Sequence, residues 1–412
     1  MEVKKVKVTK KPSLAVLIFI GLILGVVVGL LFTGNPDLID TYILPWGNLY
    51  LNLIRFIIVP VVFFSIMGGV VSMNDIRKIG SIGIRAVVFY ICTTAVAITI
   101  ALFVANLFKN SFVILDTTGV EYEVSATPPG FIDTIVDMFP SNAVAPFLNA
   151  SMLQIIFIAL IVGFGVIMAG AKAEPVTNMI EALNEVFMNV MMLIIKLSPI
   201  GAFCLISSVV ASNGPTVLGN FALVIFVAYL CYAIHMAVVY SFCVKKLGKM
   251  SPLKFFKGMM PAMMFAFSSA SSMGTLPLNM ECCEKLGAKK EVINFTLPLG
   301  ATINMDGTAI YQGVATIFIA SCFGIELTLA QMITVIFTAT IASIGTAGLP
   351  GGGPIMLLMV LESVGLPVEG IALVVGIDRV FDMGRSVVNI TGDAACSMFI
   401  SNYSPKKIAD GG

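Results

Sequence analysis

Long apolar stretches constrain the fold of this chain more than any other feature of its sequence. Six of them lie at residues 13–32, 43–72, 80–108, 142–171, 176–211 and 217–243. A helix needs about 20 predominantly apolar residues to cross the hydrocarbon core of a bilayer. Of the 412 residues, 58% are hydrophobic and 11% are charged, whereas an ordinary soluble domain has about 25% charged residues. The sequence therefore predicts an all-α protein that crosses a membrane several times.

The lengths of these stretches bear on processing and on helix geometry. The first is too long for the apolar core of a signal peptide and lacks a cleavage site, so we expect a retained membrane helix. Several others exceed the length needed to span a bilayer. This excess predicts tilts, or kinks at Pro60, Pro140, Pro146 and Pro199.

Lysine and arginine are unevenly distributed among the connections. They cluster within residues 4–11, 77–85, 245–257 and 406–407, whereas residues 110–140 are rich in aspartate and glutamate. Because cytoplasmic loops carry the excess of basic residues, a cytoplasmic N-terminus followed by six spans places every basic cluster inside. We expect a plasma-membrane protein with both termini in the cytoplasm. A net charge of +1 gives no basis for a nucleic-acid partner.

The pattern changes after residue 257. The apolar segments 261–279 and 331–362 are each interrupted at the centre, by SSASSMGTLP and by SIGTAGLPGGGP. Backbone that leaves a helix at membrane depth must be buried in protein or line a wet cavity. Both segments are therefore interpreted as re-entrant hairpins. Each precedes a helix with a polar motif, NMDGT at 304–308 and NITGD at 389–393, which indicates an inverted repeat with its binding sites at the shared interface.

Six polar residues follow one face of the last predicted helix. They are Asp378, Asp382, Arg385, Ser386, Asn389 and Asp393. At 3.6 residues per turn they fall within an arc of roughly 100°. Charged groups at membrane depth are costly and usually serve a ligand or an ion. A structural ion pair between Asp382 and Arg385 is the alternative interpretation.

The residue types on these helices narrow the ligand. Arg385 suits a carboxylate, Asp382 can accept from an ammonium group, and free N–H groups at the hairpin tips can hold a second carboxylate. Together they predict an acidic amino acid. Asp306 and Asp393, each set among asparagines, offer the all-oxygen environment that hard cations prefer.

The serine-rich hairpin, NMDGT, SIGTAGLP and DMGRSVVNITGD together resemble the glutamate transporter homologues, which are sodium-coupled symporters of dicarboxylates and amino acids. The resemblance covers residues 12 to about 401 and implies eight transmembrane helices, two re-entrant hairpins and a homotrimer in the lipid bilayer. It also implies an elevator mechanism. Residues 1–250 would form mainly the scaffold, and 251–403 the transport domain, with the helix at 80–108 moving with the latter and the second hairpin acting as a lid.

The same resemblance assigns the binding residues. Arg385 would hold the side-chain carboxylate of the substrate and Asp382 its amino group, completed by Asn389, Ser386, Thr308, Ser272 and backbone at Leu349 and Gly353. One Na⁺ would be held by Asp393 with carbonyls of Gly300, Asn304 and Asn389. A second would be held by carbonyls around Thr302, Ser343, Ile344 and Thr346, and a third by Tyr90, Thr93, Thr94, Asn304 and Asp306.

This chain departs from the family at several positions. Ala270 and Met383 stand where relatives carry an arginine, and Arg379 is one candidate to supply the missing charge. Met273 replaces a small polar residue. Gln312 stands where proton-coupled members have glutamate, so we expect no proton co-transport. His235 is interpreted as packed in an apolar helix away from all motifs.

Other functions remain as alternatives. A carrier of neutral amino acids or C4-dicarboxylates would use the same fold, but Arg385 argues against the former and Asp382 against the latter. Asp306 and Asp393 superficially suit an intramembrane aspartic protease, although neither is arranged to share a proton. An ion channel would not require two hairpins around a charged site. We therefore expect a transporter rather than an enzyme.

Overall fold

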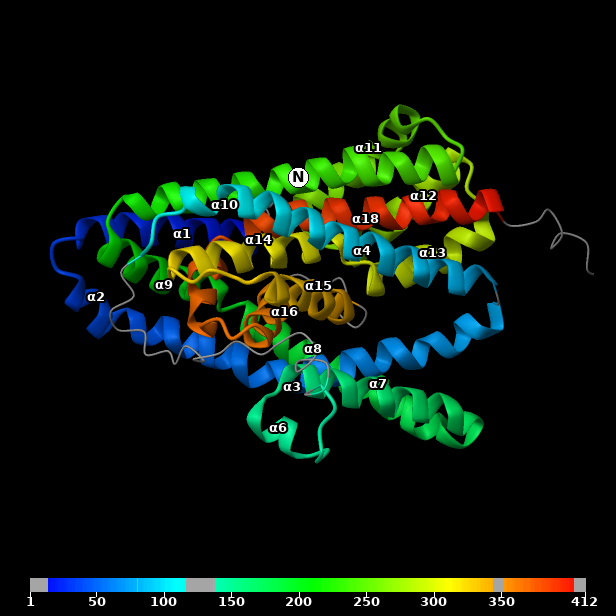
Figure 1. The fold of residues 1–412 in the computed structure, drawn as a ribbon, viewed down its shortest axis with the longest axis horizontal. Coiled ribbons are helices and arrows are strands. Elements are labelled where there is room, and N and C mark those ends of the chain that lie inside the picture. The colour runs from blue at the N-terminus through cyan, green and yellow to red at the C-terminus, as the bar shows by residue number, and fades with distance from the viewer. Residues whose placement is uncertain (1–13, 80, 116–135, 137, 344–351, 404–412) are drawn as a thin grey trace, which may run out of the picture.

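The structure is a computed structural model that describes residues 14–79, 81–115, 136, 138–343 and 352–403. Within these residues all regular structure is helical, as predicted. The long helices run roughly along the longest axis of the molecule (Figure 1). In the described part of the chain, four helical stretches are long and apolar enough to cross a membrane, at residues 44–71, 83–111, 154–195 and 216–247.

The first predicted stretches form helices close to their expected bounds. They are α1 (Leu14–Leu31), α3 (Leu44–Ile79) and α4 (Ser81–Phe108), with a short α2 (Pro36–Tyr42) between the first two and the turn η1 (Lys109–Ser111) after the last. Pro60 lies inside α3 without ending it.

The fourth and fifth predicted stretches are broken. The fourth contains a short α6 (Ala145–Asn149) and α7 (Met152–Ala169), which are separated at Ala150, a residue with a φ of 53°. After the turn η2 (Gly170–Ala173), the fifth consists of α8 (Glu174–Ile195) and α9 (Ser198–Asn213) instead of one helix. Pro199 stands in the first turn of α9, where its missing N–H costs no hydrogen bond. The proline therefore marks a helix start rather than a kink.

Glycines bring α1 and α9 close together. A Cβ atom on Gly25 would lie 2.8 Å from the backbone oxygen of Phe203, and one on Gly29 would lie 2.7 Å from Cβ of Val210. Gly21, one turn earlier on the same face, abuts the backbone of Pro199. Small residues at intervals of four allow this close approach between apolar helices.

The sixth stretch is longer than predicted and changes its winding. α10 (Thr216–Ile234) continues into two π-helical turns, η3 (His235–Tyr240) and η4 (Cys243–Leu247). Such turns are rare and often lie at functional sites.

The second half contains the two interrupted segments. α11 (Pro252–Ser269) and α12 (Ser272–Leu286) pack together, with Ala270 in the left-handed region at φ 49° and the Ser271 hydroxyl capping Gly274 N at 3.0 Å. The second pair is α15 (Leu329–Ser343) and α16 (Gly352–Ser363), and its tip lies outside the described residues. Each segment thus contains two helices, as the interruptions predict.

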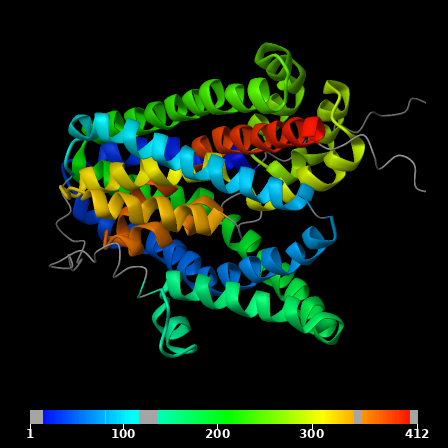
Figure 2. The ribbon, with the colours of Figure 1, turned by 45° about the vertical axis from the view of Figure 1, so that its right-hand side comes forward.

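The remaining helices surround the motifs. α13 (Lys290–Ile303) and α14 (Asp306–Cys322) are separated only by Asn304 and Met305, and the turns η5 (Val368–Ile371) and α17 (Ala372–Val375) lead into α18 (Asp378–Tyr403). α18 contacts α4, α10, α11, α12, α13 and α14. α7 lies on the far side of α3 from α18 in both views (Figures 1 and 2). The polar helix is therefore enclosed by the second half of the chain and α4.

Candidate functional site

The predicted polar stripe on α18 is buried along its whole length. Asp378 is 9% exposed, Arg385 2% and Asp393 1%, and the other three members are buried as well. Positions three, four and seven residues apart share one face of a helix, which explains why these side chains meet. The sequence-based prediction of a single polar face is confirmed.

Arg385 lies between two carboxylates and an aromatic ring. Its Nη1 and Nη2 donate to Asp378 Oδ1 and Oδ2 at 3.0 and 3.3 Å, and Nη2 also donates to Asp382 Oδ1 at 2.8 Å. The guanidinium carbon lies 4.6 Å from the ring centroid of Tyr311. The ion pair between Asp382 and Arg385 is thus real, and Asp378 adds a partner that the sequence analysis had not assigned.

Arg379 connects this cluster to the first interrupted segment. Its Nη1 lies 3.4 Å from Asp382 Oδ2, and its Nη2 donates to the Ser269 carbonyl at 2.9 Å. Ser269 precedes Ala270, where relatives were expected to carry an arginine. Arg379 therefore lies where a replacement for that charge is needed, although a replacing role remains a prediction.

A second group of polar atoms surrounds the break between α13 and α14. Asn304 Nδ2 donates to Asp393 Oδ1 at 2.8 Å and to the Asn389 carbonyl at 3.1 Å, while Gly307 N donates to Asn389 Oδ1 at 2.8 Å. Asn304 Oδ1 and Asp393 Oδ2 are buried and have no hydrogen-bond partner within the described part of the chain. Buried oxygens without donors fit a hard cation, because a cation would satisfy them. Gly300 packs directly against the Asp393 side chain, and its role in the first ion site remains a prediction.

Asp306 lies at the start of α14 and is completely buried. Thr94 Oγ1 donates to its Oδ1 at 2.6 Å, Tyr240 OH donates to its Oδ2 at 2.8 Å, and His235 Nε2 lies 3.2 Å from the same Oδ2. The interpretation of His235 as remote from the motifs was wrong. The π-helical turn η3 packs against the start of α14, and no local pattern reveals a contact between residues 71 positions apart.

The other residues predicted to bind sodium either form hydrogen bonds with backbone carbonyls or lie outside the described residues. Tyr90 OH donates to the Thr296 carbonyl at 2.9 Å, and Thr93 Oγ1 donates to the Tyr90 carbonyl at 3.1 Å. Neither hydrogen bond goes to Asp306. Thr302 and Ser343 donate to carbonyls of their own helices, at 3.1 and 2.7 Å. Ile344 and Thr346 lie outside the described residues.

The remaining predicted substrate residues are Gly353, Thr308, Ser386, Ser272 and Leu349. Gly353 packs so closely on the Arg385 guanidinium that a Cβ atom would overlap Nη1. Thr308 and Ser386 are buried, with the Thr308 hydroxyl 3.8 Å from the sulfur of Met305. Ser272 is buried at the start of α12. Leu349 lies outside the described residues.

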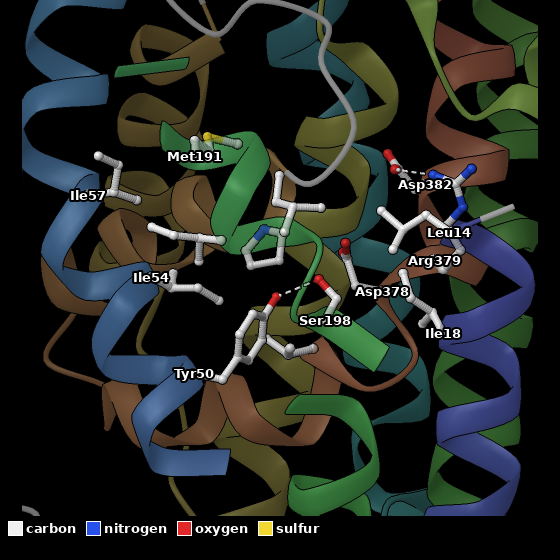
Figure 3. Close-up of a pocket in the computed structure, with 14 residues that line it drawn as sticks. Leu14, Ile18, Tyr50, Ile54, Ile57, Met191, Ser198, Asp378, Arg379 and Asp382 are labelled. Carbon is white, nitrogen blue, oxygen red and sulfur yellow. Dashed lines mark hydrogen bonds and ion pairs between the residues drawn. The ribbon is translucent and has the colours of Figure 1, made fainter. Parts of the chain in front are cut away.

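A cavity of about 60 Å³ lies beside the arginine cluster (Figure 3). Its lining is mostly apolar and comes in part from α1, α3, α8 and α9, with a hydrogen bond of 2.8 Å between Tyr50 of α3 and Ser198 of α9. Asp378, Arg379 and Asp382 line the side on which α1 lies, across from α3 (Figure 3).

Comparisons with known proteins agree with this chemistry. Residues 14–403 match the sodium:dicarboxylate symporter family. The chain is 34% identical over 402 residues to a proton/sodium-glutamate symport protein of Geobacillus stearothermophilus, covering 96% of this chain and 95% of that protein. It is 30% identical to a proton/glutamate-aspartate symporter of Escherichia coli, covering 96% and 94% of the two chains. A C4-dicarboxylate transport protein of Bacillus subtilis is also 30% identical, with coverage of 94% and 93%.

These matches run the length of the helical bundle and include the buried polar helices. The family and these relatives are transporters rather than enzymes, which removes the hydrolase alternative. The chain belongs to the sodium:dicarboxylate symporter family.

Proposed function

We propose that this protein is a sodium-coupled symporter of acidic amino acids, L-aspartate or L-glutamate, in the plasma membrane. The observation that carries the proposal is the buried guanidinium of Arg385, which faces the backbone of Gly353 and is flanked by carboxylates. A buried arginine in this position can exchange an internal carboxylate for that of a substrate as its hydrogen-bond partner. Asp382 supplies the acceptor for the substrate's amino group.

The proposed coupling ion is sodium. The unpartnered oxygens of Asn304 and Asp393 support one ion site, and the Asp306 carboxylate with the Thr94 hydroxyl supports another. A cation beside an anionic substrate stabilises it and is stabilised in return, so binding of the two is thermodynamically coupled. The relatives named for both protons and sodium make the ion a necessary part of the test.

We further propose an elevator mechanism in a homotrimer. Residues 251–403 with α4 would move as the transport domain against a scaffold built mainly from residues 1–250. The residues of α1, α3 and α8 that line the cavity beside Asp378, Arg379 and Asp382 support this division, because none of them is charged (Figure 3).

Transport of C4-dicarboxylates is the second candidate. Asp382 already receives Arg385 on one oxygen and Arg379 on the other. Its charge is therefore compensated without an ammonium group, which favours tolerance of a substrate such as succinate. The relative from Bacillus subtilis carries that name.

The experiment is uptake of labelled aspartate, glutamate and succinate into proteoliposomes. It compares an inward sodium gradient with a potassium gradient and with a pH step. We expect sodium-dependent accumulation of the two amino acids that Arg385→Ala abolishes and that Lys285→Ala, an exposed control on α12, leaves intact. Succinate accumulation alone would replace the amino-acid proposal, and uptake driven only by the pH step would contradict sodium coupling.

A further inference from the structure

The surroundings of Asp306 depend on the unusual winding of η3. His235 and Tyr240 are five residues apart, and both reach the same oxygen of Asp306, at 3.2 and 2.8 Å. Five residues along an α-helix leave two side chains about 140° apart. In a π-helical turn the backbone hydrogen bonds join residues five apart, which brings such a pair to nearly the same side. The π winding thus directs both side chains at one carboxylate.

This cluster is fully enclosed. His235, Tyr240 and Asp306 are buried completely, and the His235 and Tyr240 rings meet edge to face with centroids 4.7 Å apart. An ionised carboxylate can only accept hydrogen bonds, so a neutral imidazole meets it with N–H on Nε2. Nδ1 of the same ring has no hydrogen-bond partner among the described residues. Among the described residues, the His235 side chain therefore has a polar contact only with Asp306.

We propose that His235 is a positioning residue that fixes the Asp306 carboxylate and thereby sets its affinity for the co-transported cation. This inference rests on the proposed function. His235 and Tyr240 hold Oδ2, which leaves Oδ1 beside Thr94 as the oxygen turned toward the proposed ion site. Hydrogen bonds from neighbours orient a ligating carboxylate, and loss of such a partner typically costs about 10- to 100-fold in metal affinity.

The test measures cation binding directly, by the rise of the melting temperature of purified protein with sodium concentration, with choline as the inert cation. Binding to the native state stabilises a protein in proportion to the logarithm of ligand concentration over Kd. The variants are His235→Leu, which removes the donor, and His235→Gln, which keeps one. We expect the sodium concentration that gives a fixed rise in melting temperature to increase at least about tenfold in His235→Leu and to change less than about threefold in His235→Gln.

Transport kinetics provide the second readout. At saturating sodium we expect His235→Leu to retain the wild-type KM for substrate, because the substrate cluster around Arg385 does not contain this residue. If folded His235→Leu protein shows the sodium dependence of the wild type, the inference about His235 is wrong and the proposed sodium coupling stands. A wild-type protein that no cation stabilises overturns sodium coupling and the inference together. If His235→Leu does not fold, His235→Phe keeps an aromatic ring in the same space and is judged by the same two outcomes.

Discussion

Arg385 and Asp378 form a two-pronged ion pair across two turns of α18, with Nη1 3.0 Å from Oδ1 and Nη2 3.3 Å from Oδ2. This is the geometry in which an arginine binds a free carboxylate. Asp378 thus occupies the N–H groups of Arg385 that a substrate carboxylate would need in the proposed function.

Asp378→Asn removes this internal competitor and makes the cluster more positive. We expect the KM for aspartate to fall about threefold to tenfold, since a larger fraction of the protein has Arg385 available. The melting temperature without substrate should fall, because a buried charge loses a partner. Uptake and thermal unfolding measure the two effects, with Asp37→Asn on exposed α2 as the control. A higher KM would mean that Asp378 orients Arg385 for the substrate instead of competing with it.

Arg379→Ala leaves one Asp382 oxygen and the Ser269 carbonyl without their donor. We expect KM to rise about tenfold for succinate, which corresponds to ~1.4 kcal/mol, and less for aspartate. The difference arises because the ammonium group of aspartate can take the place of Arg379 beside Asp382. Competition between the two substrates in the same vesicles gives the ratio directly. An equal change for both, or none, would exclude Arg379 from the substrate site.

Gly353→Ala places a methyl group where the Arg385 guanidinium now lies. We expect uptake to fall at least tenfold at low substrate concentration, because Arg385 must move away from its ion-paired position. Gly165→Ala on α7 is the matched control, since no atom lies within 4 Å of its added Cβ. Normal uptake by Gly353→Ala would show that this contact is absent from the transporting protein.

Gly25→Ala tests the close approach of α1 and α9. The added Cβ meets the Phe203 carbonyl at 2.8 Å, and a backbone atom cannot rotate away. We expect a loss of about 1–3 kcal/mol in stability, as for other overpacked sites. Thermal unfolding in detergent measures it against Gly219→Ala, which has open space around the new atom. Equal melting temperatures would indicate that the two helices can separate at no cost.

Much of the fold follows from local sequence patterns, because helix length and polarity are local properties. α1, α3 and α4 lie close to their predicted bounds, and the polar face from Asp378 to Asp393 follows from helical periodicity alone. The break between α8 and α9 was missed because both sides of Lys196 are apolar and a proline permits either a kink or a helix start.

The contacts at the site were less predictable than its residue types. Asp382 was predicted to bind the amino group of a substrate, whereas in the structure its two oxygens contact Arg385 and Arg379. His235 and Tyr240 were absent from the predicted site, because only a π-helical turn brings them both to Asp306 and nothing in HMAVVY indicates that winding. The spacing of residues in the sequence predicts which of them share a face of a helix, but it does not predict which of several charged side chains each one contacts.

The charges of the side chains around Arg385 cancel, which bears on how transport would depend on membrane voltage. Two arginines and two aspartates, Arg379, Arg385, Asp378 and Asp382, sum to zero formal charge and are held together by short contacts. In an elevator cycle the return stroke without cargo would carry this cluster through the membrane field without displacing net charge. The voltage dependence of transport would then arise from the ions, the substrate and the carboxylates of Asp306 and Asp393, which these arginines do not pair.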